Sequence, residues 1–182
     1  MRALQTDLPG VLLLEPRVFG DARGFFLESW NARTFAEATG VEAAFVQDNH
    51  SRSARGVLRG IHYQLQQPQG KLVRVIAGEV LDVAVDLRRS SPAFGRWTAA
   101  VLSEHNHRQL WIPPGFGHGF LVRSGSADFL YKTTDYYAPQ HERCIAWDDA
   151  DLGIDWQLDG MQPVLSDKDR KGLALAAAET FD

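Results

Sequence analysis

The stretch "GVLRGIHYQ", residues 56–64, places a histidine, an arginine and a tyrosine in an otherwise apolar run. A neutral imidazole with a pKa near ~6.5 can accept a proton at physiological pH. Such a base works better when a carboxylate orients the ring and stabilises the imidazolium. His62 is therefore a candidate general base, and the alternative is a buried structural histidine with a satisfied partner.

Two pairs stand out among the six histidines by their surroundings. His105 and His107 lie in "EHNHRQ", a composition typical of a polar, solvated turn. His118 follows "PPGFG" in an apolar and aromatic run, as His62 does. The segments around His62 and His118 together resemble the two signature motifs of cupins.

These motifs differ from those of a metal-binding cupin. Such a protein has a second histidine two residues after the first and then a glutamate. Here Gln64 takes the second position, and Pro68 and Gln69 stand where the glutamate would fall. Two imidazoles without a nearby carboxylate make a poor site for a divalent metal. We therefore predict a cupin barrel without a bound metal, and a metal-dependent oxygenase cupin remains an alternative.

The elements that would position these groups are mostly strands. Short apolar runs recur along the chain, divided by glycine, proline and polar clusters, which is typical of an all-β protein. From residue 82 to 87, aspartate or alanine alternates with valine or leucine, a period of two that predicts a half-buried strand. Ala77–Gly78 is expected to form a tight turn between two strands.

Two short helices are also predicted. "NARTFAEATG" offers Asn31 as an N-cap and Gly40 as a C-terminal stop. "SDKDRKGLALAAA" begins with Ser166 three residues before Asp169, the spacing of a capping box. Many short strands with few helices favour an all-β, cupin-type jelly-roll barrel. Residues 1–182 contain no repeat, low-complexity tract or linker, so a single domain is expected.

Composition limits the possible partners. The 182 residues are enough for a sizeable core, and a net charge of −4 with a pI of about 5.8 argues against a broad nucleic-acid surface. An anionic small molecule stays possible, since a pocket needs only a few arginines and lysines. The single cysteine, Cys144, excludes an internal disulfide or a cysteine zinc site. Neither a membrane span nor a signal peptide is recognised, so the cytoplasm is the expected compartment.

Four further motifs occur in a fixed order: "QGKLVRV", "QLWIPPGFGHGFLV", "FLYKTTDYYAPQHE" and "LSDKDR". With "RGIHYQ" they make the chain closely resemble the dTDP-4-dehydrorhamnose 3,5-epimerase family, from about Leu8 to Arg170. The resemblance implies a metal-free jelly roll that uses no cofactor and acts on a dTDP-linked 4-keto-6-deoxyhexose. It also implies a homodimer with N-terminal strand exchange, in which the Arg23–Glu28 segment contributes to the neighbour's pocket.

The resemblance also implies a role for each matching residue. His62 would be the base and Asp169 its carboxylate partner. Tyr131 would be the acid on the opposite face of the sugar, and Lys71 would sit near the C4 carbonyl oxygen. Tyr137 would stack on the thymine ring. The remaining substrate contacts of the family fall on Arg23, Glu28, Gln47, Asp48, Asn49, Arg59, His118, Glu142 and Lys168.

These residue types fit the chemistry of epimerisation beside a ketone. Removing a proton from C3 or C5 puts negative charge on the C4 oxygen, where a donor such as Lys71 is worth roughly 2.7–4 kcal/mol. Inversion needs a second group on the other face, and a tyrosine near pKa ~10 is protonated and can donate. The carbon skeleton keeps its oxidation level, and the lack of a GxGxxG motif agrees with this. Arg23, Arg59 and Lys168 could bind the diphosphate.

Each assignment has a structural alternative. Asp169 could merely cap the last helix, Tyr131 could be a core aromatic, Lys71 could be solvated, and Arg23 could pair with Glu28 on the surface. Other functions also stay open. The protein could invert only C3 or only C5, or it could be a cupin that binds a sugar nucleotide without catalysis.

Overall fold

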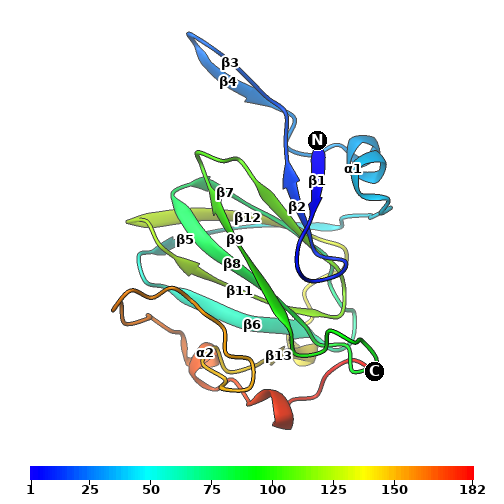
Figure 1. Cartoon of the computed structure of the whole chain (residues 1–182), viewed down its shortest axis with the longest axis vertical. Coiled ribbons are helices and arrows are strands. Elements are labelled where there is room, and N and C mark those ends of the chain that lie inside the picture. Colours follow the sequence, from blue (N-terminus) through cyan, green and yellow to red (C-terminus); the bar gives the residue numbers. More distant parts are fainter.

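Two antiparallel sheets dominate the computed structural model, which describes all residues 1–182 (Figure 1). In spatial order, the six-stranded sheet contains β1 (Arg2–Gln5), β2 (Leu12–Glu15), β10 (Gln109–Ile112), β7 (Lys71–Ala77), β12 (Ser126–Thr133) and β5 (Gln47–Ala54). The five-stranded sheet contains β13 (Glu142–Cys144), β6 (Leu58–Gln64), β11 (Phe116–Val122), β8 (Glu79–Asp86) and β9 (Trp97–Ser103). Most neighbouring strands are distant in sequence, as in a jelly roll, and the predicted all-β barrel is confirmed.

A separate hairpin of β3 (Val18–Asp21) and β4 (Gly24–Leu27) projects from one end of the barrel (Figure 1). It belongs to neither sheet. Its phenylalanines, Phe19, Phe25 and Phe26, are all exposed.

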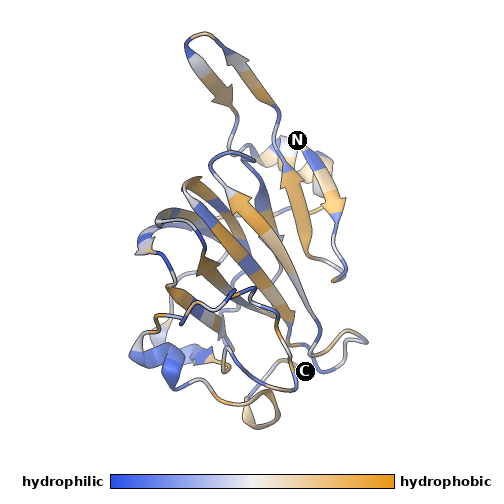
Figure 2. Cartoon of the chain, turned by 60° about the vertical axis from the view of Figure 1, so that its left-hand side comes forward, coloured by the Kyte–Doolittle hydropathy of each residue, from blue (hydrophilic) through white to orange (hydrophobic).

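The expected helices form where their capping residues stand. Helix α1 (Ala32–Thr39) begins after Asn31, whose side chain accepts hydrogen bonds from two backbone N–H groups, and ends at Gly40 in the left-handed conformation. Helix α2 (Asp167–Arg170) carries the capping box of Ser166 and Asp169 and is hydrophilic throughout (Figure 2). Two 3-10 turns span Pro139–His141 and Leu175–Ala177. None of the helices combines the length and apolar character needed to cross a bilayer.

Two apolar layers hold the five-stranded sheet in place. One fills the space between the two sheets and includes Val73 and Phe129 from one sheet and Val80 and Phe120 from the other. The second lies on the outer face of the five-stranded sheet, where residues of the C-terminal segment such as Trp156 cover β8. The turn at Ala77–Gly78 joins β7 to β8, which belong to different sheets.

The prediction that residues 82–87 form a half-buried strand is wrong. Residues 80–86 of β8 are all buried, and the carboxylates of Asp82 and Asp86 are fully enclosed. The apolar face of β8 packs under the C-terminal segment, while the face carrying the aspartates points between the sheets or toward Arg88. A period of two reports alternating faces but not what covers the polar one.

Candidate active site

A cavity of about 540 Å³ opens between the two sheets, a size that suits a small organic ligand. Its wall includes residues of β5, β6, β7, β11, β12, β13 and α2. Most of the predicted site residues line it: His62, Tyr131, Asp169, Lys71, Arg59, His118, Tyr137, Glu142 and Lys168. Segments far apart in the sequence therefore converge as the motifs predicted.

A β-bulge explains why both Arg59 and His62 face this cavity. Residues three apart on a regular strand point to opposite faces. On β6, however, His62 pairs with His118 while Arg59 pairs with Phe120, so β6 carries one extra residue relative to β11. Gly60 lies at this irregularity with a φ of +125°, and a Cβ there would stand 2.5 Å from the Cα of Gly119. Only glycine fits that position.

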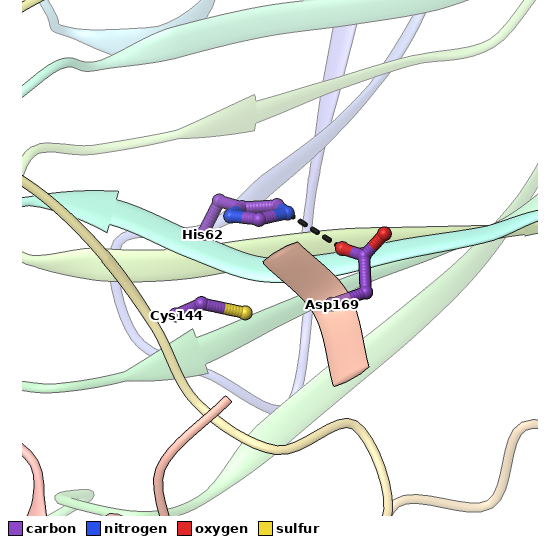
Figure 3. Close-up of side chains that lie close together, drawn as sticks. All are labelled: His62, Cys144 and Asp169. Carbon is purple, nitrogen blue, oxygen red and sulfur yellow. Dashed lines mark hydrogen bonds and ion pairs between the residues drawn. The ribbon is translucent and has the colours of Figure 1, made fainter. Parts of the chain in front are cut away.

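The bulge also helps to build a His–Asp pair. The Nε2 atom of His62 lies 2.7 Å from the Oδ1 atom of Asp169 (Figure 3), and the backbone N–H of Gly60 donates to the same oxygen over 3.0 Å. The other carboxylate oxygen accepts hydrogen bonds from the backbone N–H and the hydroxyl of Ser166. Asp169 therefore both caps α2 and holds His62, so a capping role does not exclude its role as the carboxylate partner of the base.

The charge of this pair follows from its contacts. Burial alone raises the pKa of Asp169, but hydrogen bonds from His62, Gly60 and Ser166 outweigh it and place the pKa well below its usual range. The ionised carboxylate can only accept, so Nε2 of His62 carries the hydrogen and Nδ1 carries the lone pair. Nδ1 has no hydrogen-bond partner and lies 3.9 Å from Oε1 of Glu142. Nδ1 is thus the atom able to accept a proton.

Glu142 belongs to a network at the edge of the cavity. Its Oε2 accepts hydrogen bonds from Nζ of Lys168 over 2.7 Å and from the hydroxyl of Tyr137 over 3.0 Å. Burial raises the pKa of Glu142, but the hydrogen bonds from Lys168 and Tyr137 outweigh burial, so the net pKa of Glu142 lies below its usual value. In return, Glu142 raises the pKa of Lys168. Gln47 supports the same loop, because its side-chain oxygen accepts from the backbone N–H of Tyr137.

Tyr131 and Lys71 enter the cavity from the sheet opposite His62. Tyr131 lies on β12 and Lys71 begins β7, both in the six-stranded sheet. Burial raises the pKa of Tyr131, so its hydroxyl is protonated at neutral pH and is a donor. Burial lowers the pKa of Lys71 to about 8, which leaves it mostly charged at pH 7. A base on one wall thus faces an acid and a cation on the other.

Sequence reasoning missed one buried acid of this site. Asp82 on β8 lies behind His118, whose Nε2 stands 2.9 and 3.2 Å from its two carboxylate oxygens. An aspartate inside an otherwise apolar strand could have indicated this buried acid, but we assigned Asp82 to an exposed face of the strand.

Two of the predicted substrate-binding residues, Arg23 and Glu28, do not line the cavity of their own chain. Arg23 is 90% exposed and pairs with Asp21 over 2.6 Å, so the surface pair with Glu28 expected as its alternative does not form. Glu28 instead accepts hydrogen bonds from Asn31 and Thr34.

Strand β5 splits the "QDN" run between its two faces. Gln47 and Asn49 share a hydrogen bond on the inward side, whereas Asp48 points outward and pairs with Lys132. Alternation along β5 makes this unavoidable, because consecutive side chains point to opposite faces.

One group of possible metal ligands lies within the site. Single ligand atoms of His62, Cys144 and Asp169 lie within 4.8 Å of one another (Figure 3). Asp169 is already fully hydrogen-bonded, and burial raises the pKa of the Cys144 thiol to about 12, which disfavours the thiolate that would bind a metal. Gln64, where a metal cupin has its second histidine, instead ties down the loop that carries Tyr137 through Tyr136 and Ala138.

Comparison with known proteins decides the family. The family model for dTDP-4-dehydrorhamnose 3,5-epimerase matches residues 5–177. The chain belongs to this family. It is 63% identical over 181 residues to the dTDP-4-dehydrorhamnose 3,5-epimerase of Pseudomonas aeruginosa, covering 100% of this chain and 99% of the relative.

Solved structures of the family share the fold. The dTDP-6-deoxy-D-glucose-3,5-epimerase of Legionella pneumophila, in complex with dTDP-4-keto-L-rhamnose, superposes with a TM-score of 0.95 at 52% identity, covering 98% of this chain and 94% of that one. A 3'-monoepimerase of Streptomyces bikiniensis, in complex with dTDP-quinovose, gives a TM-score of 0.90 at 35% identity, covering 98% and 89%. The cupin-type fold is therefore confirmed, and enzymes named for one inversion share it with enzymes named for two.

Proposed function

We propose that the protein converts dTDP-4-dehydro-6-deoxy-D-glucose to dTDP-4-dehydro-L-rhamnose by inverting C3 and C5. One observation carries the proposal: a carboxylate-held imidazole and a phenol occupy opposite walls of one cavity. Inversion requires this, because a base that returned its own proton to the same face would restore the starting configuration. Family membership and the similarity to named 3,5-epimerases support the same substrate class.

The first step is removal of a proton from the carbon beside the C4 ketone. Nδ1 of His62 takes the proton, and Asp169 stabilises the imidazolium through Nε2. The logic is that of the base and its orienting acid in a serine-protease triad, without a nucleophile. No redox cofactor is needed, because no electrons leave the sugar.

The second step is stabilisation and reprotonation of the enolate. The ammonium of Lys71 compensates the charge that develops on the C4 oxygen, and Tyr131 returns a proton from the opposite wall. Repetition at the other alpha carbon gives the double inversion. The same base can serve both carbons if the ring reorients in the cavity between steps.

Binding of the nucleotide uses the mouth of the cavity. The guanidinium of Arg59 and the ammonium of Lys168 are both exposed cations that line it, and they suit a diphosphate. Tyr137 is about half exposed and offers a ring face for thymine. Lys168 now pairs with Glu142, so the diphosphate would compete with that carboxylate.

The unused residues suggest a homodimer. The β3–β4 hairpin projects from the barrel (Figure 1) and carries Arg23. Phe19 and Phe26 are paired across the hairpin and are both exposed, whereas the ring of Phe25 packs against His107 of the barrel. Contiguous exposed aromatics mark interaction surfaces, and a second copy would bring Arg23 and Glu28 to the neighbouring cavity. Light scattering of a Phe26→Asp variant tests this, since a mass unchanged from the wild-type protein would place the interface elsewhere.

We treat residues 1–182 as one epimerase domain, since both sheets and α2 contribute to one cavity. A cytoplasmic location stays a prediction; the only cysteine, Cys144, is unpaired.

A monoepimerase is the second candidate function, because the 3'-monoepimerase of Streptomyces bikiniensis shares this fold. Incubation of the substrate in deuterated water separates the possibilities by NMR. Deuterium at both C3 and C5, together with rhamnose formation on adding the downstream reductase and NADPH, supports the proposal. Deuterium at one carbon alone indicates a monoepimerase, and none at either carbon indicates a binding protein without catalysis.

A further inference from the structure

Each inversion leaves the two catalytic side chains in the wrong protonation state for the next one. His62 has gained the proton that left the carbon, and Tyr131 has given its own proton away. Before the same pair can act on the second carbon, the imidazolium must lose a proton and the phenolate must gain one. The two side chains belong to opposite walls of the cavity. The proton on His62 therefore needs its own route to water.

The contacts of His62 leave one carboxylate on the side of Nδ1. The Nδ1 atom is buried and has no hydrogen-bond partner, while Nε2 is held by Asp169. Oε1 of Glu142 lies 3.9 Å from Nδ1. This oxygen is free, because Lys168 and Tyr137 both donate to Oε2 of the same carboxylate. A small rotation of the Glu142 side chain would bring Oε1 within hydrogen-bond distance of a protonated Nδ1.

The other titratable groups around His62 are poorer routes for a proton. Cys144 is paired with His62 on β13, but burial raises the pKa of its thiol to about 12, so the thiol keeps its proton. His118 is paired with His62 on β11, but it is only 7% exposed. The remaining groups that line the cavity near the sugar site are two cations and the acid of the opposite wall: Arg59, Lys71 and Tyr131.

Glu142 lies between the base and the mouth of the cavity. Its side chain is 22% exposed, and that of Lys168, which binds it, is 66% exposed. Burial raises the pKa of Glu142, but the hydrogen bonds from Lys168 and Tyr137 bring the net pKa below its usual value. These two donors are also the proposed contacts of the diphosphate and the thymine. When the diphosphate binds Lys168, the carboxylate loses its cation and accepts a proton more readily.

We propose that Glu142 accepts the proton from His62 and transfers it to water between successive inversions. The inference rests on the proposed function, in which His62 is the base. The proton passes from Nδ1 to Oε1, so one N–H bond breaks and one O–H bond forms. The carboxylic acid then releases the proton to water at the mouth. Another proton from the solvent restores the phenol of Tyr131, so neither charge nor electrons are gained or lost in the cycle.

The variant Glu142→Gln tests this, because it keeps the size and shape of the side chain but cannot take up a proton. A single turnover in deuterated water, quenched at increasing times, gives the rates of exchange at the first and the second carbon by NMR. The ratio of the first rate to the second should rise by roughly tenfold or more, since a proton-transfer group contributes at least that much. An unchanged ratio would overturn the proposal.

Rescue by a small base separates a proton carrier from a residue that only shapes the cavity. Added imidazole should restore steady-state turnover of Glu142→Gln as its concentration rises, whereas the wild-type protein should not respond. Asp169→Asn should not be rescued, because its side chain is only 2% exposed and acts before the proton leaves Nδ1. If turnover of Glu142→Gln were equally low at every imidazole concentration, Glu142 would be a binding group and the proposal would fail.

Glu179→Gln is the matched control. Glu179 is 68% exposed and pairs with Arg143 outside the cavity, so its variant loses the same charge without touching the route. It should match the wild type in both assays. A wild-type protein that exchanges neither carbon refutes the proposed function itself. Exchange at both carbons with an unchanged ratio in Glu142→Gln refutes this inference alone, and a protein that exchanges one carbon is judged by the imidazole rescue.

Discussion

The His62–Asp169 pair allows a sharp test through the variant Asp169→Asn. The carboxylate accepts at both oxygens: Oδ1 from His62 and Gly60, and Oδ2 from the backbone and hydroxyl of Ser166. An asparagine has one acceptor and one donor, so it can serve only one of these two sides. Whichever way the amide turns, its NH₂ group meets donors on the other side.

The two orientations have different consequences. If the NH₂ group faces His62, the imidazole must accept at Nε2 and carry its hydrogen on Nδ1, so the proposed base loses its lone pair. If the NH₂ group faces Ser166, the cap of α2 is lost, which costs about 1 kcal/mol, and the imidazolium loses its counter-charge. We expect kcat to fall by ~10²-fold or more, because general-base catalysis raises the rate by at least that factor and the wrong tautomer of the base lowers the rate even more.

The assay is deuterium exchange at C3 and C5 combined with chemical unfolding, and Ser166→Ala is the control. That variant removes both hydrogen bonds of the Ser166 hydroxyl, the one accepted from the backbone N–H of Asp169 and the one donated to Oδ2, but keeps the contact between His62 and Oδ1. It should lose about 1 kcal/mol of unfolding free energy with a far smaller fall in exchange rate. If both variants lost stability alike and Asp169→Asn exchanged at the normal rate, Asp169 would be a helix cap alone.

Three further predictions address the other groups of the cavity. Tyr131→Phe should slow inversion more than solvent exchange, measured by NMR on one sample; equal losses would point to a different acid. Arg59→Ala should raise the Kd for dTDP in calorimetry by roughly tenfold, as expected for loss of a charge-assisted hydrogen bond. Arg55→Ala, outside the cavity, should leave the Kd unchanged, and equal Kd values for the two variants would show that Arg59 does not bind the diphosphate. The Lys71 ammonium is present below its pKa of about 8, so kcat should fall as the pH rises through 8, and a flat profile from pH 7 to 10 would exclude a charged lysine.

Local signals predicted the elements well. Asn31 and Gly40 bound α1, and Ser166 and Asp169 form the capping box of α2, because capping depends on residues only a few positions apart. The glycine inside the His62 strand was visible too, but we did not interpret it as a bulge.

Contacts between distant segments could not be derived from periodicity. Asp169 lies 107 residues from His62, and only the family motif suggested the pairing. The buried Asp82 was misplaced because both faces of β8 are covered: the C-terminal segment packs on the apolar face, and the six-stranded sheet covers the face that carries Asp82. The pattern of the strand alone does not show this. Likewise, the motif grouped Asp48 with Gln47 and Asn49, whereas the pleat of β5 separates their side chains.

The placement of Asp169 on α2 links chemistry to completion of the chain. Both sheets end by residue 144, yet the acid that steadies the imidazole arrives only with the short turn at residues 167–170. A polypeptide clipped between these points would retain every strand of the barrel and lack the partner of His62. Turnover therefore reports whether the tail has docked, which makes proton exchange a sensitive gauge of tail integrity in any preparation of this protein.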